Sequence, residues 1–234
     1  MPDHDHGQNP IILPISMSPK ILFGSILLFI GISSSKAQTD VIDNAKYNEA
    51  VEFYNRGKID YDIKQFQSAI ENFRRAFLLN PTNSDYPFDL SISYYEIKKY
   101  DSALKYIELA IALEPNQPDY HYRAGNIFFH KKDYSNAVHN YNITLANLND
   151  EHPINIQNCY YNKAVSEYNL GNYTSTISDL TKLIKEDSTD FTYLHLRGVS
   201  YLRTKKVREG CVDLLKAYKL GNSKSEEYLG RYCP

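Results

Sequence analysis

The sequence lacks both a strong charge bias and a long apolar run. Its 234 residues carry a formal net charge of −2, and acidic and basic residues are interspersed along the chain. This balance gives no reason to expect binding to nucleic acid or to an anionic membrane surface. The most apolar stretch, residues 21–32, is shorter than the roughly 18 residues that a membrane-spanning helix needs.

The recurring motifs of catalysis and cofactor binding are also missing. The chain contains no GxxxxGKS/T phosphate loop, no HExxH zinc motif, no GxSxG nucleophile elbow and no glycine-rich dinucleotide turn. His121, His130 and His139 are evenly spaced, but they fall on two expected helices at different angles, which disfavours a metal site. We therefore expect no catalytic residue, no metal and no cofactor. An enzyme or a regulatory domain with an unrecognised site is the alternative.

Cysteine is scarce, and the three residues present leave one without a partner if the other two pair. Cys211 and Cys233 lie near the C-terminus, where a disulfide between them would fix the end of the chain. The alternative is that both are small buried hydrophobic side chains. A zinc site is disfavoured because no CxxC or paired histidine spacing accompanies them.

The N-terminal region has the features of a cleavable signal peptide over residues 1–37. Lys20 precedes the apolar stretch 21–32, and small residues stand at the positions that precede a cut before Gln38. Translation from Met17 would give a more ordinary leader, and we hypothesise that start. The expected location is outside the cytoplasm, periplasmic or extracellular. The alternative is a protein anchored in the membrane by residues 21–32.

What the sequence does contain is a repeat of 34 residues. Aromatic, small and proline residues each recur at this interval, and only a repeated unit of supersecondary structure keeps them in phase. The matching positions are Phe66, Tyr100 and Tyr134; Ala69, Ala103 and Ala137; Ala76 and Ala110; Gly57, Ser91 and Gly125; and Pro81 and Pro115.

Each unit reads as a pair of amphipathic helices. In residues 50–83 apolar residues recur at helical spacing in both halves. Pro81 ends the second helix, because a proline inside a helix loses a hydrogen bond and clashes with the preceding turn. Gly57 and Ala69 are placed where the two helices cross most closely, so larger side chains would push the helix axes apart.

This pattern resembles the tetratricopeptide repeat family, whose unit is a helix-turn-helix with aromatic, small and proline residues at fixed offsets. The resemblance implies an all-α fold, a right-handed α-solenoid. After a lead-in over residues 38–49 and with an insertion near 149–156, the units are predicted at 50–83, 84–117, 118–151, 157–190 and 191–224. The insertion indicates an extended second helix or a longer turn.

A capping helix is predicted over residues 225–234. Gly221 suits the left-handed end of the preceding helix, and the spacing from Ser223 to Glu226 suits a capping box at the start of the next one. Such a helix would cover the last apolar face of the solenoid.

In this family the first helices of successive units line the concave face. Carried over residue by residue, that rule gives a tyrosine-rich groove suited to an extended peptide or a partner's helix. Tyrosine at these positions also fits packing between helices, so both interpretations stay open. The groove residues so predicted are Tyr54, Lys58, Tyr61, Phe88, Ile92, Tyr95, Tyr122, Asn126, Phe129, Tyr161, Tyr168 and Arg203.

The resemblance implies a non-catalytic scaffold for protein–protein interaction, whose protein or peptide partner is not encoded in the sequence. An accessory role in an envelope or secretion assembly is one setting for it. Some relatives hold a partner's C-terminal carboxylate with Lys and Asn on the first helices. Here Asp89 and Asp119 take two of those places and would repel a carboxylate, and only Arg123 fits. A clamp of that kind is not predicted.

Overall fold

The structure is a computed structural model that describes residues 43–148 and 154–233. The chain divides into two units, residues 1–48 and 49–234, and the repeats lie in the second. The predicted signal peptide, the start at Met17 and most of the predicted insertion fall outside the described residues. None of the helices in the described ranges is long and apolar enough to cross a membrane.

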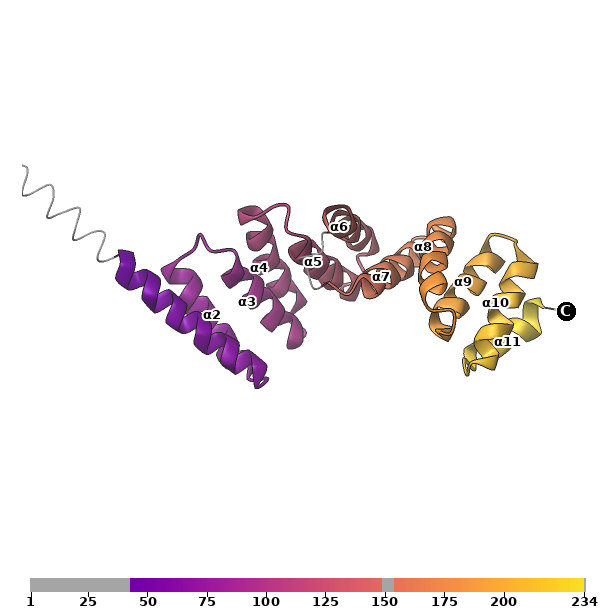
Figure 1. Ribbon diagram of the computed structural model, residues 1–234, viewed down its shortest axis with the longest axis horizontal. Helices are drawn as coiled ribbons and strands as arrows, with labels where there is room; N and C mark the ends of the chain where they lie inside the picture. Colours follow the sequence, from indigo (N-terminus) through magenta and orange to yellow (C-terminus); the bar gives the residue numbers. More distant parts are fainter. Residues whose placement is uncertain (1–42, 149–153, 234) are drawn as a thin grey trace, which may run out of the picture. The chain divides into compact units, whose positions relative to one another are not determined.

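The described chain consists of helices joined by short turns, and it contains no strand (Figure 1). A helix over residues 43–62 comes first. The helices that follow are α2 (Phe66–Leu79), α3 (Asp85–Glu96), α4 (Tyr100–Leu113), α5 (Pro118–His130), α6 (Tyr134–Asn147), α7 (Ile156–Asn169), α8 (Tyr173–Glu186), α9 (Phe191–Arg203), α10 (Val207–Lys219) and α11 (Lys224–Tyr232).

Consecutive helices of the second unit pack against each other. The helices α3 and α4, α5 and α6, α7 and α8, and α9 and α10 pack as the two helices of one repeat. The second helix of each pair also packs on the first helix of the next, and α11 contacts α10 and α9 as a further first helix would. The predicted all-α solenoid of paired helices is confirmed.

The recurring small residues mark the places where helices touch. Ala69, Ala103 and Ala137 are fully buried. A Cβ atom at Gly57 would lie 2.6 Å from the ring of Phe73, so no larger residue fits there without moving the ring. The period therefore reflects contacts in the core.

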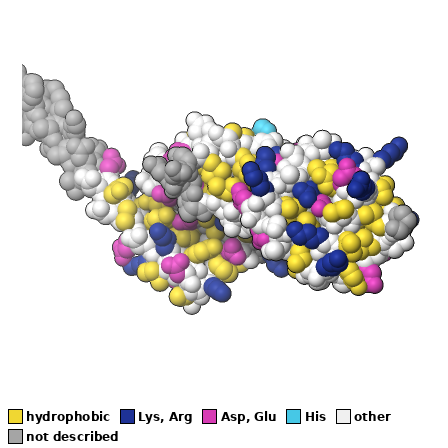
Figure 2. Space-filling view, turned by 45° about the vertical axis from the view of Figure 1, so that its right-hand side comes forward, with side chains coloured by type: hydrophobic (Ala, Val, Ile, Leu, Met, Phe, Trp, Pro, Cys, Tyr) yellow, Lys and Arg dark blue, Asp and Glu magenta, His cyan; other side chains and the backbone are white. Residues whose placement is uncertain are grey.

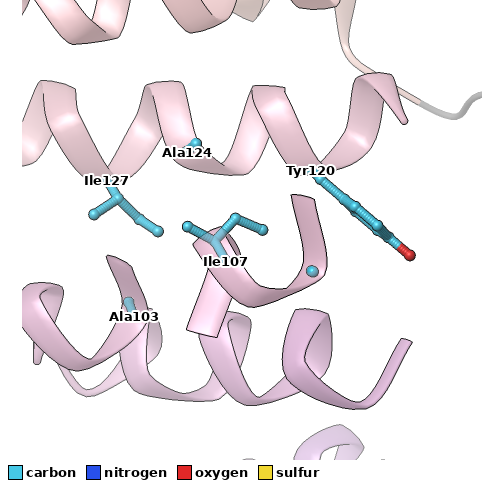
Figure 3. Close-up of a cluster of buried hydrophobic side chains, with 6 residues drawn as sticks. Ala103, Ile107, Tyr120, Ala124 and Ile127 are labelled. Atoms are coloured by element: carbon cyan, nitrogen blue, oxygen red, sulfur yellow. The ribbon is translucent and has the colours of Figure 1, made fainter. Parts of the chain in front are cut away.

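Apolar side chains of neighbouring repeats fill the space between these contacts. Figure 3 shows Ile107 of α4 directed toward Ile127 of α5, with Ala103, Tyr120 and Ala124 in the same buried cluster. The cluster lies between the second helix of one repeat and the first helix of the next. Stability thus comes from contacts between neighbouring units, as expected for a repeat protein.

The last repeat departs from the alanine pattern for a steric reason. Gly210 of α10 stands where earlier units have alanine, and a Cβ atom there would lie 2.9 Å from the carbonyl oxygen of Gly198 on α9. A Cβ atom at Gly198 would in turn lie 3.1 Å from the carbonyl oxygen of Gly210. Here the two helices cross so closely that only glycine fits on both sides.

The turn inside each repeat contains one residue with a positive φ. Four of these five residues are lysines, with φ between 58° and 62°, and only Gly171 is a glycine. A lysine in this left-handed region is strained by its Cβ atom, whereas a glycine is not. The residues with a positive φ are Lys64, Lys98, Lys132, Gly171 and Lys205.

Of the two interpretations of the insertion, an extended helix is wrong. The helix α6 ends at Asn147 and has the same 14 residues as α2 and α4. Residues 149–153 lie outside the described part of the chain.

Of the two features predicted around the start of α11, the glycine that ends α10 is confirmed and the capping box is not. Gly221 has a φ of 107°, and the N–H of Asn222 donates to the carbonyl of Ala217 at 2.9 Å, which closes α10. The predicted capping box is wrong: Ser223 is itself helical and its side chain makes no capping hydrogen bond.

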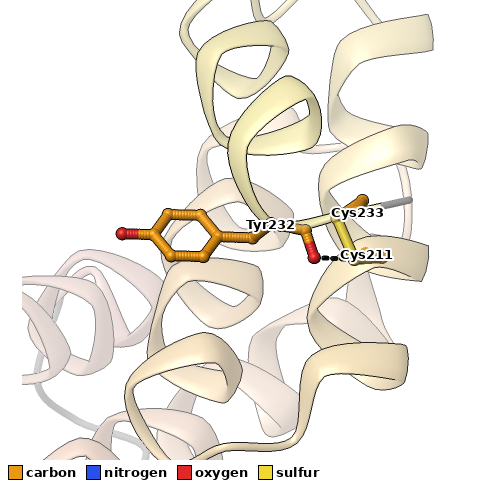
Figure 4. The surroundings of a disulfide bond; sticks show 3 residues. All are labelled: Cys211, Tyr232 and Cys233. Atoms are coloured by element: carbon orange, nitrogen blue, oxygen red, sulfur yellow. Dashed lines mark hydrogen bonds between the residues drawn. A yellow bond between two sulfur atoms is a disulfide. The ribbon is translucent and has the colours of Figure 1, made fainter.

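A disulfide joins Cys211 of α10 to Cys233 at the end of α11, with their Cα atoms 5.7 Å apart (Figure 4). The ring of Tyr232, the residue before Cys233, points away from the bond in this view. The third cysteine, Cys159, is buried and free. The disulfide holds α11 against α10.

Candidate functional site

The first helices of the first three repeats enclose a pocket of about 260 Å³. Three of the predicted groove residues line it, namely Lys58, Tyr61 and Ile92, so the structure brings these residues together. The other lining residues are Asp62, Phe73, Asp89 and Arg123, none of which was assigned to the groove from sequence. We call this site the N-terminal pocket.

Two cations face the N-terminal pocket without a carboxylate partner. The ammonium of Lys58 lies 5.6 Å from the ring centroid of Tyr54, and the guanidinium of Arg123 lies 5.0 Å from that of Tyr95. Within residues 43–148 and 154–233 neither cation forms an ion pair, and the buried Nε of Arg123 has no hydrogen-bond partner. A buried donor without an acceptor is costly, so an oxygen atom brought to this N–H would remove an energetic penalty.

Asp89, one of two acids in the lining of the pocket, has a carboxyl whose pKa is raised. Burial, together with the nearby charge of Asp85, raises the pKa of its carboxyl to about 6. The Tyr54 hydroxyl, Lys58 and Arg123 oppose this shift, because each favours the ionised carboxylate. At neutral pH the pocket therefore presents an ionised acceptor close to an unused donor.

Aromatic rings pack beside the two cations of the pocket. Tyr54 packs against Phe73 and Tyr86, with ring centroids 5.7 and 4.9 Å away. Tyr95 packs against Tyr100 at 5.6 Å. The two rings that the cations contact, Tyr54 and Tyr95, therefore each pack against at least one other ring.

Three predicted groove residues of the third repeat serve mainly in packing. Asn126 is buried, and its side-chain oxygen accepts hydrogen bonds from Tyr141 at 2.8 Å and from Asn162 at 3.2 Å. Tyr122 packs beside Tyr141, and Phe129 packs beside His130 and Tyr134. Packing is thus the role of at least part of the tyrosine-rich stripe.

The remaining predicted residues do not line the N-terminal pocket. Phe88 of α3 packs against Tyr120, with ring centroids 4.7 Å apart. Tyr161 packs against Tyr193, and Tyr168 packs against Tyr173, in both cases at 5.4 Å.

Arg203 lies beside the Tyr168 hydroxyl, whose interaction raises the pKa of the guanidinium. Arg203 therefore contacts another predicted groove residue, but these two lie in the last two repeats and are not part of the N-terminal pocket.

The sequence held a usable signal for two of the four lining residues that were not assigned to the groove. Asp89 and Arg123 are 34 residues apart, so they occupy the same position in successive units. This position carries a negative charge in one unit and a positive charge in the next. Because it lies on the first helix of each unit, the two opposite charges lie close together. The N-terminal pocket depends on this pair.

The three evenly spaced histidines do not come together. His121 is buried and bonds through its ring nitrogens to Asn140 and to the carbonyl of Pro115, at 3.0 and 2.9 Å. His130 stacks on Tyr100, and His139 is exposed. Across the described ranges, no group of three or more His, Cys, Asp or Glu side chains is placed to hold a metal ion.

Comparison with known proteins connects this fold to one family. A family model described as tetratricopeptide repeat matches residues 63–124. The crystal structure of MamA protein aligns with a TM-score of 0.65 at 17% identity, over 80% of this chain and 96% of that one.

The crystal structure of YrrB, described as a TPR protein with an unusual peptide-binding site, aligns with a TM-score of 0.71 at 14% identity, over 83% of this chain and 97% of that one. A search of curated proteins gave no match. At these identities the two structures show a shared fold.

Proposed function

Taking as premise that the chain is a tetratricopeptide repeat protein, a class that generally serves as a non-catalytic interaction module, we propose that it binds an extended peptide segment of a partner protein in the N-terminal pocket. The first helices of the first three repeats would hold the segment. No step of chemistry is assigned to the site.

The single observation that carries this proposal is a buried donor without an acceptor, close to a carboxylate that accepts from the Tyr54 hydroxyl but has no ion-pair partner in the described ranges. The Nε–H of Arg123 has no acceptor, and the Asp89 carboxylate has no ion-pair partner within residues 43–148 and 154–233. An extended peptide offers a carbonyl oxygen and an N–H in alternation, so it satisfies both groups at once. A free carboxylate would satisfy Arg123 but would be repelled by Asp89.

The surrounding rings favour an apolar or aromatic side chain next to the bound peptide unit. Tyr61, Phe73 and Ile92 line the pocket, and tyrosine gives a large contact area at low entropy cost. YrrB, which shares this fold and is described as having a peptide-binding site, supports the same class of ligand.

The test begins by selecting binders from a random peptide library displayed on phage, with the full chain as bait. Affinities are then measured by calorimetry for the wild type and for Lys58→Ala with Arg123→Ala. Loss of charged hydrogen bonds worth about 1.5–3 kcal/mol predicts an affinity about 10–100 times lower. The control is Arg74→Ala with Lys105→Ala, which removes two exposed cations from second helices and should leave the affinity unchanged.

The proposal would be contradicted if the selected peptides bind the variant Lys58→Ala with Arg123→Ala as tightly as they bind the wild type. The same result follows if the control pair lowers affinity equally, because a general loss of positive charge would then explain both.

We further propose that the protein works outside the cytoplasm, accessory to an envelope or secretion assembly. The signal-peptide pattern over residues 1–37 supports this location. N-terminal sequencing of the protein recovered from cells tests it: a chain that begins at Gln38 agrees, and a chain that keeps residues 21–32 contradicts it.

A further inference from the structure

The C-terminal repeat carries an open apolar groove between α10 and α11, with a volume of about 690 Å³. We call it the C-terminal groove. It is remote in sequence from the N-terminal pocket and shares no residue with it. Its lining residues are Val207, Arg208, Cys211, Val212, Leu215, Leu229 and Cys233.

The apolar residues of this groove are exposed although α10 already buries a different face. Leu214 and Ala217 are fully buried against the rest of the repeat, whereas Val207, Val212 and Leu215 are 44%, 62% and 45% exposed. A helix that is apolar on two faces has one face more than its own core needs. Contiguous exposed apolar side chains of this kind mark an interaction site more often than scattered ones do.

The end of the chain is also distinctly basic. Residues 203–233 contain eight lysines and arginines and four acidic residues, in a protein whose overall formal charge is −2. One of the four acids, Asp213, is already paired with Arg197 through contacts of 2.7 and 2.9 Å. Figure 2 shows dark blue Lys and Arg side chains interspersed with yellow apolar ones over the C-terminal part of the molecule, at the right of the view.

We propose that the C-terminal groove binds an amphipathic helix of a partner protein, one whose apolar face is flanked by acidic side chains. Val207, Cys211 and Leu215 follow one another at intervals of four residues, which is the ridge spacing that another helix packs against. Arg208, the charged residue in the lining, complements acidic flanks. A concave apolar site fits a helix, whereas a membrane surface is met by apolar residues that protrude.

The disulfide keeps this groove in shape. Cys211 and Cys233 both line it, and their bond fixes the end of α11 as its second wall (Figure 4). Cys211 occupies the repeat position of Leu104, Val138 and Ile177 in earlier units. A covalent bond therefore stands where those units have an apolar side chain.

The experiment measures fluorescence anisotropy of a labelled model peptide of about 18 residues, or five helical turns. One version has leucines on one face and glutamates on the rest, and its matched version has lysines in place of the glutamates. The wild-type full chain is expected to bind the glutamate peptide and not the lysine peptide. Val212→Glu with Leu215→Glu should lower the affinity about tenfold or more.

Two variants control for general effects. Leu78→Glu changes a side chain that is 73% exposed on α2 and should leave binding unchanged. Arg208→Glu keeps the apolar lining and should weaken the glutamate peptide while allowing the lysine peptide to bind. It serves as the test if the double glutamate variant loses its helical circular dichroism.

Several results would overturn the inference. Equal binding of both peptides would remove the charge argument, and equal loss with Leu78→Glu would remove the site. Loss with Arg123→Ala would place the peptide in the N-terminal pocket, so failure here is distinguishable from failure of the proposed function. Two further results would show that another occupant binds the groove. One is sedimentation of the protein with phosphatidylglycerol vesicles, and the other is formation of dimers in the ultracentrifuge, in each case abolished by Val212→Glu.

Discussion

Two first-helix cations of the first three repeats and two of the last two repeats are used in opposite ways. In the last two, Lys163 and Arg197 stand at the same repeat position and bind the acids Asp179 and Asp213, at 2.8 and 2.7 Å. These pairs are largely buried inside their own repeats. In the first three repeats, Lys58 and Arg123 lie on aromatic rings at the N-terminal pocket and form no ion pair within the described ranges.

This difference separates charge used for folding from charge left for binding. A paired buried cation has its donors satisfied and offers nothing to a partner. Arg123 keeps an Nε–H that has no acceptor among the described residues. Of the four predictions below, the first two test that separation, and the other two test how the backbone differs between repeats.

The largest effect is expected where a buried pair is broken. Asp213→Ala leaves the guanidinium of Arg197 buried without its bidentate partner, and we expect a loss of about 3–5 kcal/mol in the free energy of unfolding. Urea denaturation followed by circular dichroism measures it. Arg123→Ala is the matched comparison and should change stability by less than about 1 kcal/mol. Equal losses in the two variants would end the distinction between the repeats.

The next effect has the opposite sign and depends on pH. The pKa of Asp89 is about 6 in the fold, against its usual 3.8, so the folded state binds the proton more tightly than the unfolded state does. Stability therefore falls as pH rises from about 4 to 6 and stays low at pH 7. Asp89→Asn should raise the free energy of unfolding at pH 7 by about 1–3 kcal/mol and flatten this dependence.

The same substitution should weaken peptide binding, because it removes the charged acceptor. Unfolding curves at pH 4, 5, 6 and 7 test the stability effect. A variant that is no more stable than the wild type at pH 7, or one with an unchanged pH profile, would show that Asp89 is not strained.

A smaller loss is expected when the family pattern is restored in the last repeat. Gly210→Ala places a Cβ atom 2.9 Å from the carbonyl oxygen of Gly198, and a backbone atom cannot turn away as a side chain can. Overpacking of this kind costs about 1–3 kcal/mol, against the gain of roughly 1 kcal/mol from helix propensity. We expect a lower melting temperature, with Gly230→Ala, where the added atom meets nothing within 4 Å, as the control that does not lose stability.

The smallest effect concerns the left-handed turns. Lys98 has a φ of 58°, at the repeat position where the fourth unit has Gly171. Replacing it by glycine relieves the backbone and should stabilise the protein by about 0.5–1 kcal/mol. Gly171→Ala should lose a similar amount, although nothing lies within 4 Å of the added atom. Thermal melts of both variants show whether the φ angle alone determines if a substitution stabilises or destabilises the protein.

Much of the fold could be predicted because the period records contacts in the core. Ala69, Ala103 and Ala137 are 34 residues apart and all fully buried, so their spacing located the helix pairs. The residues that depart from the period gave less information about the local structure around them. Neither the mutual glycine contact at Gly210 nor the strained lysine turns could be read from the sequence, since both depend on distances and φ angles.

The site was predicted only in outline. The rule that first helices line the concave face found Lys58, Tyr61 and Ile92, but it could not tell a lining tyrosine from a packed one, as Tyr122 beside Tyr141 shows. Whether a side chain packs or faces solvent depends on its neighbours in other repeats. From the sequence, Asp89 and Arg123 were considered only as parts of a carboxylate clamp. Their role in the pocket depends on their lying close together, which only the structure shows.

The most direct test of the central claim is a crystal structure of the full chain with a peptide selected by phage display. We predict an extended peptide in the N-terminal pocket, with a main-chain oxygen within about 3 Å of the Arg123 Nε and an N–H directed at the Asp89 carboxylate. A peptide bound on the second helices, or one that leaves the Arg123 Nε unbonded, would contradict the account.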